Sequence, residues 1–147
     1  MKSDTRAAAL NNLANCLYLA SQTSPSPQES LTKARSAIDR ALAIREHPGF
    51  LDTLGIIAVS LEDRPTALRA FRRAKELQPD SAACDVGLAS ALVKGSPLER
   101  KEAETLIRSV DSKPEALRDL SPARRKVLAK TRAALDLPAP PSNAPER

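Results

Sequence analysis

Apolar residues recur along this chain at the spacing of α-helices. Leu13 and Leu17 fall on one helical face, and Ala34, Ile38 and Ala41 fall on one face of the next segment. Residues three or four positions apart lie over one another on a helix, so this pattern indicates helices with one buried side. It predicts seven of them, at residues 4–21, 28–46, 49–61, 65–77, 81–94, 98–110 and 122–136. The pattern at residues 111–120 is weaker and compatible with one further turn.

Prolines and capping residues mark where several of these segments begin. A proline is tolerated in the first turn of a helix but breaks a helix interior. Ser26 precedes Glu29 by three residues and Ser96 precedes Glu99 in the same way, which is the spacing of a capping box. Ser121 stands before a proline and is expected to cap the last helix. Four prolines crowd the last ten residues, so a flexible, proline-rich tail is predicted at 137–147.

The amino-acid composition agrees with an all-helical fold. The chain has 147 residues, of which 41% are hydrophobic, and this is enough for one domain with a buried core. Alanine and leucine contribute 25 and 20 residues, whereas valine and isoleucine contribute five each and aromatic residues three. Strands need β-branched and aromatic side chains, so the composition excludes a β-sandwich, a β-barrel and a parallel α/β sheet.

Residues 48–81 carry a repeat motif of large and small side chains. Its members are Leu51, Leu54, Gly55, Ala58, Ala67, Phe71, Ala74 and Pro79. Their spacing resembles the tetratricopeptide (TPR) pattern W-x2-L-G-x2-Y…A-x3-F…P, with Leu51 in place of the Trp and Ala58 in place of the Tyr. In this pattern Gly55 and Ala67 let two helices cross closely, and Phe71 fills the space between that helix pair and the next.

The TPR resemblance implies an all-α fold in which antiparallel helix hairpins stack into a right-handed superhelix, an α-solenoid. Looser matches on both sides of the motif predict repeats at about 7–47, 48–81 and 82–112, within a TPR domain of residues 1–136. The helix at 122–136 is expected to cap the open end of the stack by packing against helix 98–110. Its inward residues would be Val127, Leu128, Thr131 and Leu135, and its outward residues Arg124, Arg125 and Lys130.

Side chains suited to catalysis or metal binding are few. His47 is the only histidine, Cys16 and Cys84 lie in apolar stretches, and four isolated glycines form no phosphate-binding loop. We therefore expect a protein that is not an enzyme and has no cofactor and no metal site. No apolar run is long enough to span a membrane, and the first residues lack the apolar core of a signal peptide, so a cytoplasmic location is expected.

By the same resemblance, the chain is an interaction module whose first helix in each hairpin lines a concave groove. These first helices are nearly uncharged: residues 7–20 contain no charged residue and residues 49–61 only Asp52. We therefore expect the groove to bind a peptide or a helix of a partner protein. The residues predicted to line it are Asn11, Asn15, Tyr18, Asp52, Ile56, Val59, Val86, Ser90 and Val93.

Other interpretations stay open. The net charge of +5 and the arginines of the second helices and capping helix favour an anionic partner on the convex face. The scarcity of aromatic residues counts against nucleic acid. The chain could also be the C-terminal assembly segment of a longer TPR array, and self-association is a further option. Binding of a chaperone C-terminal carboxylate is not expected, because Asn11, Ala83 and Gly87 stand at the basic clamp positions and Asn15 alone matches.

Overall fold

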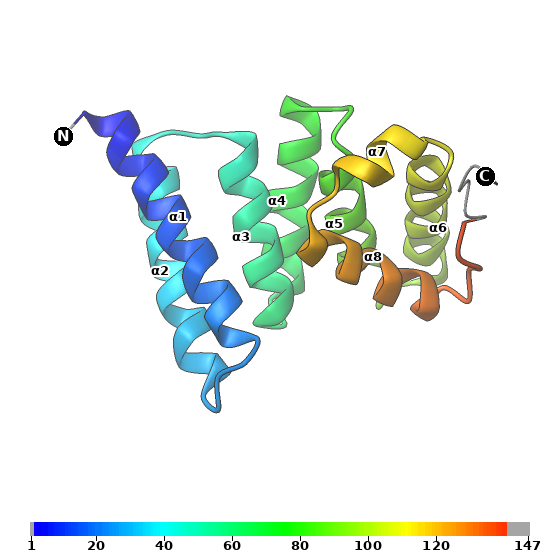
Figure 1. The fold of residues 1–147 in the computed structure, drawn as a ribbon, viewed down its shortest axis with the longest axis horizontal. Coiled ribbons are helices and arrows are strands. Elements are labelled where there is room, and N and C mark those ends of the chain that lie inside the picture. The colour runs from blue at the N-terminus through cyan, green and yellow to red at the C-terminus, as the bar shows by residue number, and fades with distance from the viewer. Residues whose placement is uncertain (1, 141–147) are drawn as a thin grey trace, which may run out of the picture.

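The structure, a computed structural model, describes residues 2–140, and every regular element in this range is a helix (Figure 1). The helices are α1 (Ser3–Ser21), α2 (Pro27–Ile44), α3 (Pro48–Ser60), α4 (Arg64–Leu77), α5 (Ala82–Leu92), α6 (Pro97–Asp111), α7 (Pro114–Asp119) and α8 (Pro122–Ala134). The prediction of an all-α chain is confirmed. Residues 111–120 contain the short α7, and the predicted tail at 137–147 lies outside the described residues from 141 onward.

Side-chain caps were expected at the starts of α2, α6 and α8, and two of these three helices have them. At α6 the Ser96 hydroxyl accepts a hydrogen bond from the Glu99 N–H, and the Glu99 carboxylate accepts one from the Ser96 N–H, so this capping box is confirmed. Ser121 caps α8 by accepting from the Arg124 N–H. The capping box at Ser26 is wrong, because the Ser26 side chain makes no capping hydrogen bond.

Consecutive helices pair into three hairpins, α1–α2, α3–α4 and α5–α6, which stand side by side along the molecule (Figure 1). Neighbouring hairpins touch through α2 and α3 and through α4 and α5. Small side chains allow close packing within a hairpin: Ala14 of α1 and Ala34 and Ala41 of α2 are fully buried in one cluster. The first helices α1, α3 and α5 also contact one another in order, so they form one continuous wall.

The aromatic ring of Phe71 joins the second hairpin to the third. Phe71 is completely buried, and its ring occupies space left by Gly55 of α3 and Gly87 of α5. A Cβ atom at either glycine would lie within 3.0 Å of the ring, closer than packed carbon atoms approach. The expected position of Phe71 between two hairpins is confirmed. The repeat motif did not predict that Gly87 also leaves space for the ring.

The last helix lies elsewhere than expected. We predict α8 over α6, but it packs mainly against α5. Leu128 and Thr131 are buried, as expected, whereas the outward position predicted for Arg124 is wrong because this residue is only 7% exposed. The physical reason is the character of α5, which buries residues on every side. A helix that is apolar all round must be covered on both sides, and α8 covers the side that the hairpins leave open.

Alanine at Gly55 or at Gly87 is expected to destabilise the fold. Helix propensity favours alanine over glycine by about 1 kcal/mol, but overpacking against the Phe71 ring costs about 1–3 kcal/mol. The net loss in the free energy of unfolding is therefore up to about 2 kcal/mol for each variant. Urea unfolding followed by circular dichroism measures it.

The control for this prediction is the Phe71→Leu background, which removes the ring. There Gly55→Ala should become neutral or stabilising, because the helix-propensity gain is no longer opposed. Gly87→Ala should keep part of its loss, because its Cβ atom would still lie within 3.0 Å of Arg124 Nη1. Gly49→Ala is a second control, since its Cβ would contact only the His47 side chain, at 3.2 Å. Equal losses with and without the ring would show that the space around Phe71 is not what these glycines preserve.

Candidate functional site

A groove runs along the wall of first helices, between α1 and α8. It consists of three adjoining hollows of about 530, 280 and 240 Å³. The first two hollows share Tyr18 of α1, Ile56 of α3 and Val127 of α8, and the second and third share Val59 and Ser90. The floor of the groove therefore includes α3, and α1 and α8 are the two sides of the first two hollows. The third hollow contains no residue of α1 or α8, and the charged residues Glu62, Arg64 and Lys94 are part of its lining.

Seven of the nine predicted groove residues line these hollows: Asn15, Tyr18, Asp52, Ile56, Val59, Ser90 and Val93. The prediction for Val86 is wrong, because this residue is completely buried in a cluster that includes Leu128 of α8. Asn11 lies outside the three hollows and is half-buried, with a buried side-chain oxygen that has no hydrogen-bond partner. Hollows therefore lie at the predicted positions on α1 and α3, whereas Val86 of α5 is covered.

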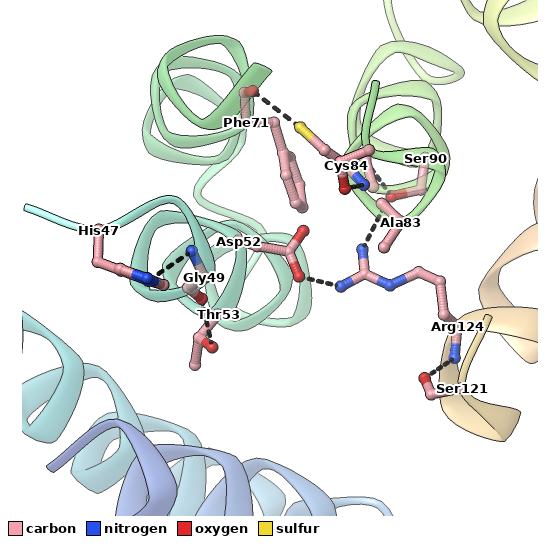
Figure 2. A network of polar contacts seen from close by, with 12 residues as sticks. His47, Gly49, Asp52, Thr53, Phe71, Ala83, Cys84, Ser90, Ser121 and Arg124 are labelled. Atoms are coloured by element: carbon pink, nitrogen blue, oxygen red, sulfur yellow. Dashed lines mark hydrogen bonds and ion pairs between the residues drawn. The ribbon is translucent and has the colours of Figure 1, made fainter. Parts of the chain in front are cut away.

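At one end of the groove, Arg124 of α8 reaches across to α3 (Figure 2). Its Nη2 atom donates to Asp52 Oδ2 at 2.5 Å, and its Nη1 atom donates to the Ala83 carbonyl oxygen of α5 at 3.0 Å. One side chain thereby ties three helices together. A Cβ atom at Gly87 would also lie within 3.0 Å of Arg124 Nη1. The same glycine therefore makes room for the guanidinium and for the Phe71 ring.

The Asp52–Arg124 pair lies in a poorly solvated place. The Asp52 side chain is 23% exposed and that of Arg124 8%. Asp52 Oδ1 is buried and has no hydrogen-bond partner. Burial raises the pKa of the Asp52 carboxyl, and the positive charge of Arg124 acts in the opposite direction. The ionised carboxylate therefore depends on Arg124, and removing this arginine would leave an uncompensated buried charge.

The contribution of α8 to the groove is what the sequence analysis missed. The lining residues from this part of the chain are Ser121, Pro122, Ala123, Arg124, Val127, Lys130, Thr131 and Ala134. Arg124 looked like a surface residue because arginine is seldom buried unless paired. Two features of the sequence do point to a covered α5: its apolar residues occur all round the helix, and Gly87 stands in its middle.

Two arginines of α4, Arg72 and Arg73, are paired with acidic neighbours. Arg72 of α4 donates to both carboxylate oxygens of Glu102 in α6, at 2.9 and 3.2 Å. Arg73 donates to Glu46, which precedes α3, and to Glu76. The hydrogen bond from Arg73 holds the pKa of the Glu46 carboxyl below its ordinary value. The basic face expected from the sequence therefore consists, at these positions, of ion pairs that link neighbouring hairpins.

Of the cysteine and histidine side chains, those of Cys84 and His47 make local hydrogen bonds to the backbone. Cys84 Sγ donates to the Phe71 carbonyl oxygen at 3.2 Å (Figure 2), and burial raises the pKa of its thiol to about 12. His47 Nδ1 accepts from the Gly49 N–H at the start of α3. Cys16 is exposed on α1. Within residues 2–140, no group of three His, Cys, Asp or Glu side chains is placed to hold a metal ion.

A scan against protein-family models matches none of them, and searches of curated proteins and of solved structures find no match either. None of the helices at residues 2–140 combines the length and the apolar character needed to cross a membrane.

The two cysteines should differ sharply in thiol reactivity. We expect Cys16 to react with Ellman's reagent in the native protein at pH 8, and Cys84 only after unfolding, because it is buried and remains protonated. The folded pKa of about 12 lies above the ordinary value of 9.0, so Cys84 favours the folded state below pH 9 and this contribution is lost as pH rises toward 12. The Cys16→Ser variant isolates Cys84. A native-state reaction of that variant as fast as that of a free thiol would contradict the burial.

Proposed function

We propose that this chain is a non-catalytic, TPR-type interaction module that binds an apolar segment of a partner protein in the groove between α1 and α8. The observation that carries the proposal is the groove itself, which runs continuously over the first helices and has Ile56 and Val59 among its lining residues. The charged pair at its widest hollow, Asp52 and Arg124, is already compensated internally. An uncharged ligand would therefore meet little unpaired charge there.

The lining of the groove suits a single segment rather than a broad surface. Helices on both sides limit the ligand to one helix or one extended stretch, which are two common modes of peptide recognition. Tyr18 offers an apolar ring with a polar tip, and Asn15 and Ser90 offer groups for hydrogen bonds to a peptide backbone. Apolar contact would supply affinity, and these polar groups would set the direction of the bound segment.

Packing details support the TPR-type description. Gly55 and Ala67 occupy the expected small positions, with Ala67 completely buried. Phe71 lies between hairpins, as the repeat motif requires. The three hairpins follow one another in the order expected of stacked repeats.

Binding of an anionic partner is the less supported alternative. Arg72 and Arg73 are engaged by glutamates, and Arg124 is buried. Lys126 and Lys130 on α8 are exposed and make no ion pair within residues 2–140. Lys130 lines the groove itself, so its charge would add to the binding of a segment that carries an acidic residue.

Two double variants and two salt concentrations should separate these functions. The probes are peptides selected from a random display library against the immobilised full chain. Introducing charge into a desolvated contact is strongly unfavourable, so Ile56→Glu with Val59→Glu should weaken their binding at least about tenfold. Arg72→Glu with Arg73→Glu should leave it unchanged. Fluorescence titration at 0.1 M and 0.5 M NaCl should give similar dissociation constants, since apolar contacts are not screened by salt.

The opposite pattern would assign binding to the basic residues. Affinity that falls steeply between the two salt concentrations, is lost with the arginine variant and survives the Ile56 and Val59 substitutions would sink the groove proposal. Circular dichroism of each variant before titration establishes that the helices are intact.

A further inference from the structure

The second hollow of the groove carries positive charge that no acidic residue of its lining balances. Lys94, directly after α5, and Lys130 of α8 both line this hollow, and both are exposed. Neither makes an ion pair within residues 2–140, and no aspartate or glutamate lines the second hollow. In the first hollow, by contrast, the two charged residues Asp52 and Arg124 are paired with each other. The groove therefore differs in charge along its length.

The serine and threonine hydroxyls of the second hollow can accept hydrogen bonds but have no proton left to donate. Ser60, Ser90 and Thr131 line this hollow. Each hydroxyl donates to the carbonyl oxygen three or four positions earlier in its own helix, at 3.1, 2.7 and 2.8 Å. A hydroxyl group has a single proton. These oxygens therefore offer only lone pairs to a ligand, which suits an N–H donor and not a carboxylate.

Four helices end at the second hollow. α1, α3 and α8 each contribute earlier residues to the first hollow and later residues to the second, so these helices run along the groove in the same sense. α5 contributes only residues near its C-terminal end. The C-terminal end of a helix carries a partial negative charge, equivalent to about half an elementary charge. These ends favour hydrogen-bond donors inside the hollow, whereas the two exposed lysines favour carboxylates at its edge.

The first turn of an acidic helix presents both kinds of group together. The first four N–H groups of a helix have no partner within the helix, and acidic side chains are favoured in this turn. We propose that the groove binds its partner as an amphipathic helix that begins at the second hollow and has aspartate or glutamate in its first turn. The acidic side chains pair with Lys94 and Lys130, and the free N–H groups face the hydroxyl oxygens. This inference rests on the proposed function and adds the chemistry and direction of the ligand.

The first hollow suits the other end of such a helix. Its lining includes Leu19, Pro122 and Ala123, and it shares Ile56 and Val127 with the second hollow. Its volume of about 530 Å³ accommodates apolar side chains of the ligand. α8 begins beside this hollow, and the partial positive charge of a helix N-terminus favours the C-terminal end of a bound helix. The bound helix therefore runs opposite to α1, α3 and α8.

The two ion pairs determine the direction of the bound helix more than its affinity. An exposed ion pair changes a dissociation constant by up to about fivefold, because water and salt screen it. This is compatible with the weak salt dependence expected of apolar contacts in the same groove. A helix bound in the reverse direction would place its carbonyl oxygens against hydroxyls that have no free proton, and its acidic first turn away from both lysines.

Selection of peptides tests the chemistry of the ligand. A display library of helix-forming peptides is selected against the immobilised full-length chain and against the full-length Lys94→Glu, Lys130→Glu chain. Groove binders are those that lose binding to the chain with Ile56→Glu and Val59→Glu. Those selected on the wild type should be enriched at least about threefold in Asp and Glu in their first turn, relative to the library. The charge-reversed chain should select Lys and Arg at the same positions.

Titration with a matched control tests the two lysines. The probe is a selected acidic peptide, acetylated and amidated so that only its side chains supply charge. The Lys94→Glu, Lys130→Glu chain should bind it at least about fivefold more weakly than the wild type does. The control chain carries Lys101→Glu and Lys126→Glu, the same charge change at exposed lysines that line none of the three hollows, and should bind like the wild type.

Disulfide trapping measures the direction of the bound helix. The Cys16→Ser background removes the exposed thiol, and single cysteines are introduced by Gln22→Cys in the second hollow or Ala123→Cys in the first. The selected peptide with an added N-terminal cysteine should cross-link at least about tenfold faster to position 22 than to position 123. The same peptide with its cysteine at the C-terminus should show the opposite preference.

The proposed function and this inference fail separately. Selected peptides that all bind regardless of the Ile56 and Val59 substitutions would overturn the proposed function, and the direction of the ligand with it. Groove binders without acidic residues in the first turn, equal weakening by the target and control charge reversals, or faster trapping of the N-terminal cysteine at position 123 would each overturn this inference while the groove proposal stands.

Discussion

The arrangement of this molecule depends on the ring of Phe71. This ring is held between two helices that lack side chains at the contact. Gly55 and Gly87 come from consecutive first helices, and the space of both is taken by one ring from α4. The ring therefore sets how closely α3 and α5 lie to α4 and to each other. The spacing of the first helices, and with it the shape of the groove that they line, therefore depends on this ring. Gly87 also leaves room for the Arg124 guanidinium, so the packing that joins two hairpins determines where the last helix can be anchored.

The anchoring of α8 depends in part on a poorly solvated ion pair at one end of the groove. Asp52 and Arg124 are costly to bury separately, and together they place a compensated pair at the end of an apolar groove. The pair joins the start of α8 to α3, while Arg132 near the other end of α8 pairs with Asp111 of α6. As a result the last helix forms one side of the groove and covers the apolar side of α5. The arginines of the second helices act in a similar way at the opposite surface, where Arg72 and Arg73 connect hairpins through glutamates.

Most local features of this structure and the position of Phe71 between two hairpins could be predicted from the sequence, whereas the position of α8 and the Ser26 cap could not. The helices follow from the spacing of apolar residues, and the start of α6 follows from Ser96 and Glu99. Most of the predicted groove residues line the hollows because they flank the buried positions of their helices, and they are half-buried or, at Val93, buried. Val86 was misplaced because its environment depends on α8, which is distant in the sequence. The position of α8 depends on contacts such as the one between Arg124 and Asp52, which local spacing along the chain does not predict.

The bond between Asp52 and Arg124 spans 72 residues of sequence, and this separation has a consequence during synthesis of the chain. At typical elongation rates of about 5–20 residues per second, the ribosome adds Arg124 roughly 4–14 s after Asp52. Hairpin formation takes far less time, so the first two hairpins can assemble on the ribosome while the carboxylate is still hydrated and the open side of α5 is uncovered. The apolar side of α5 is covered only when α8 emerges, and until then the nascent chain presents this surface to solvent.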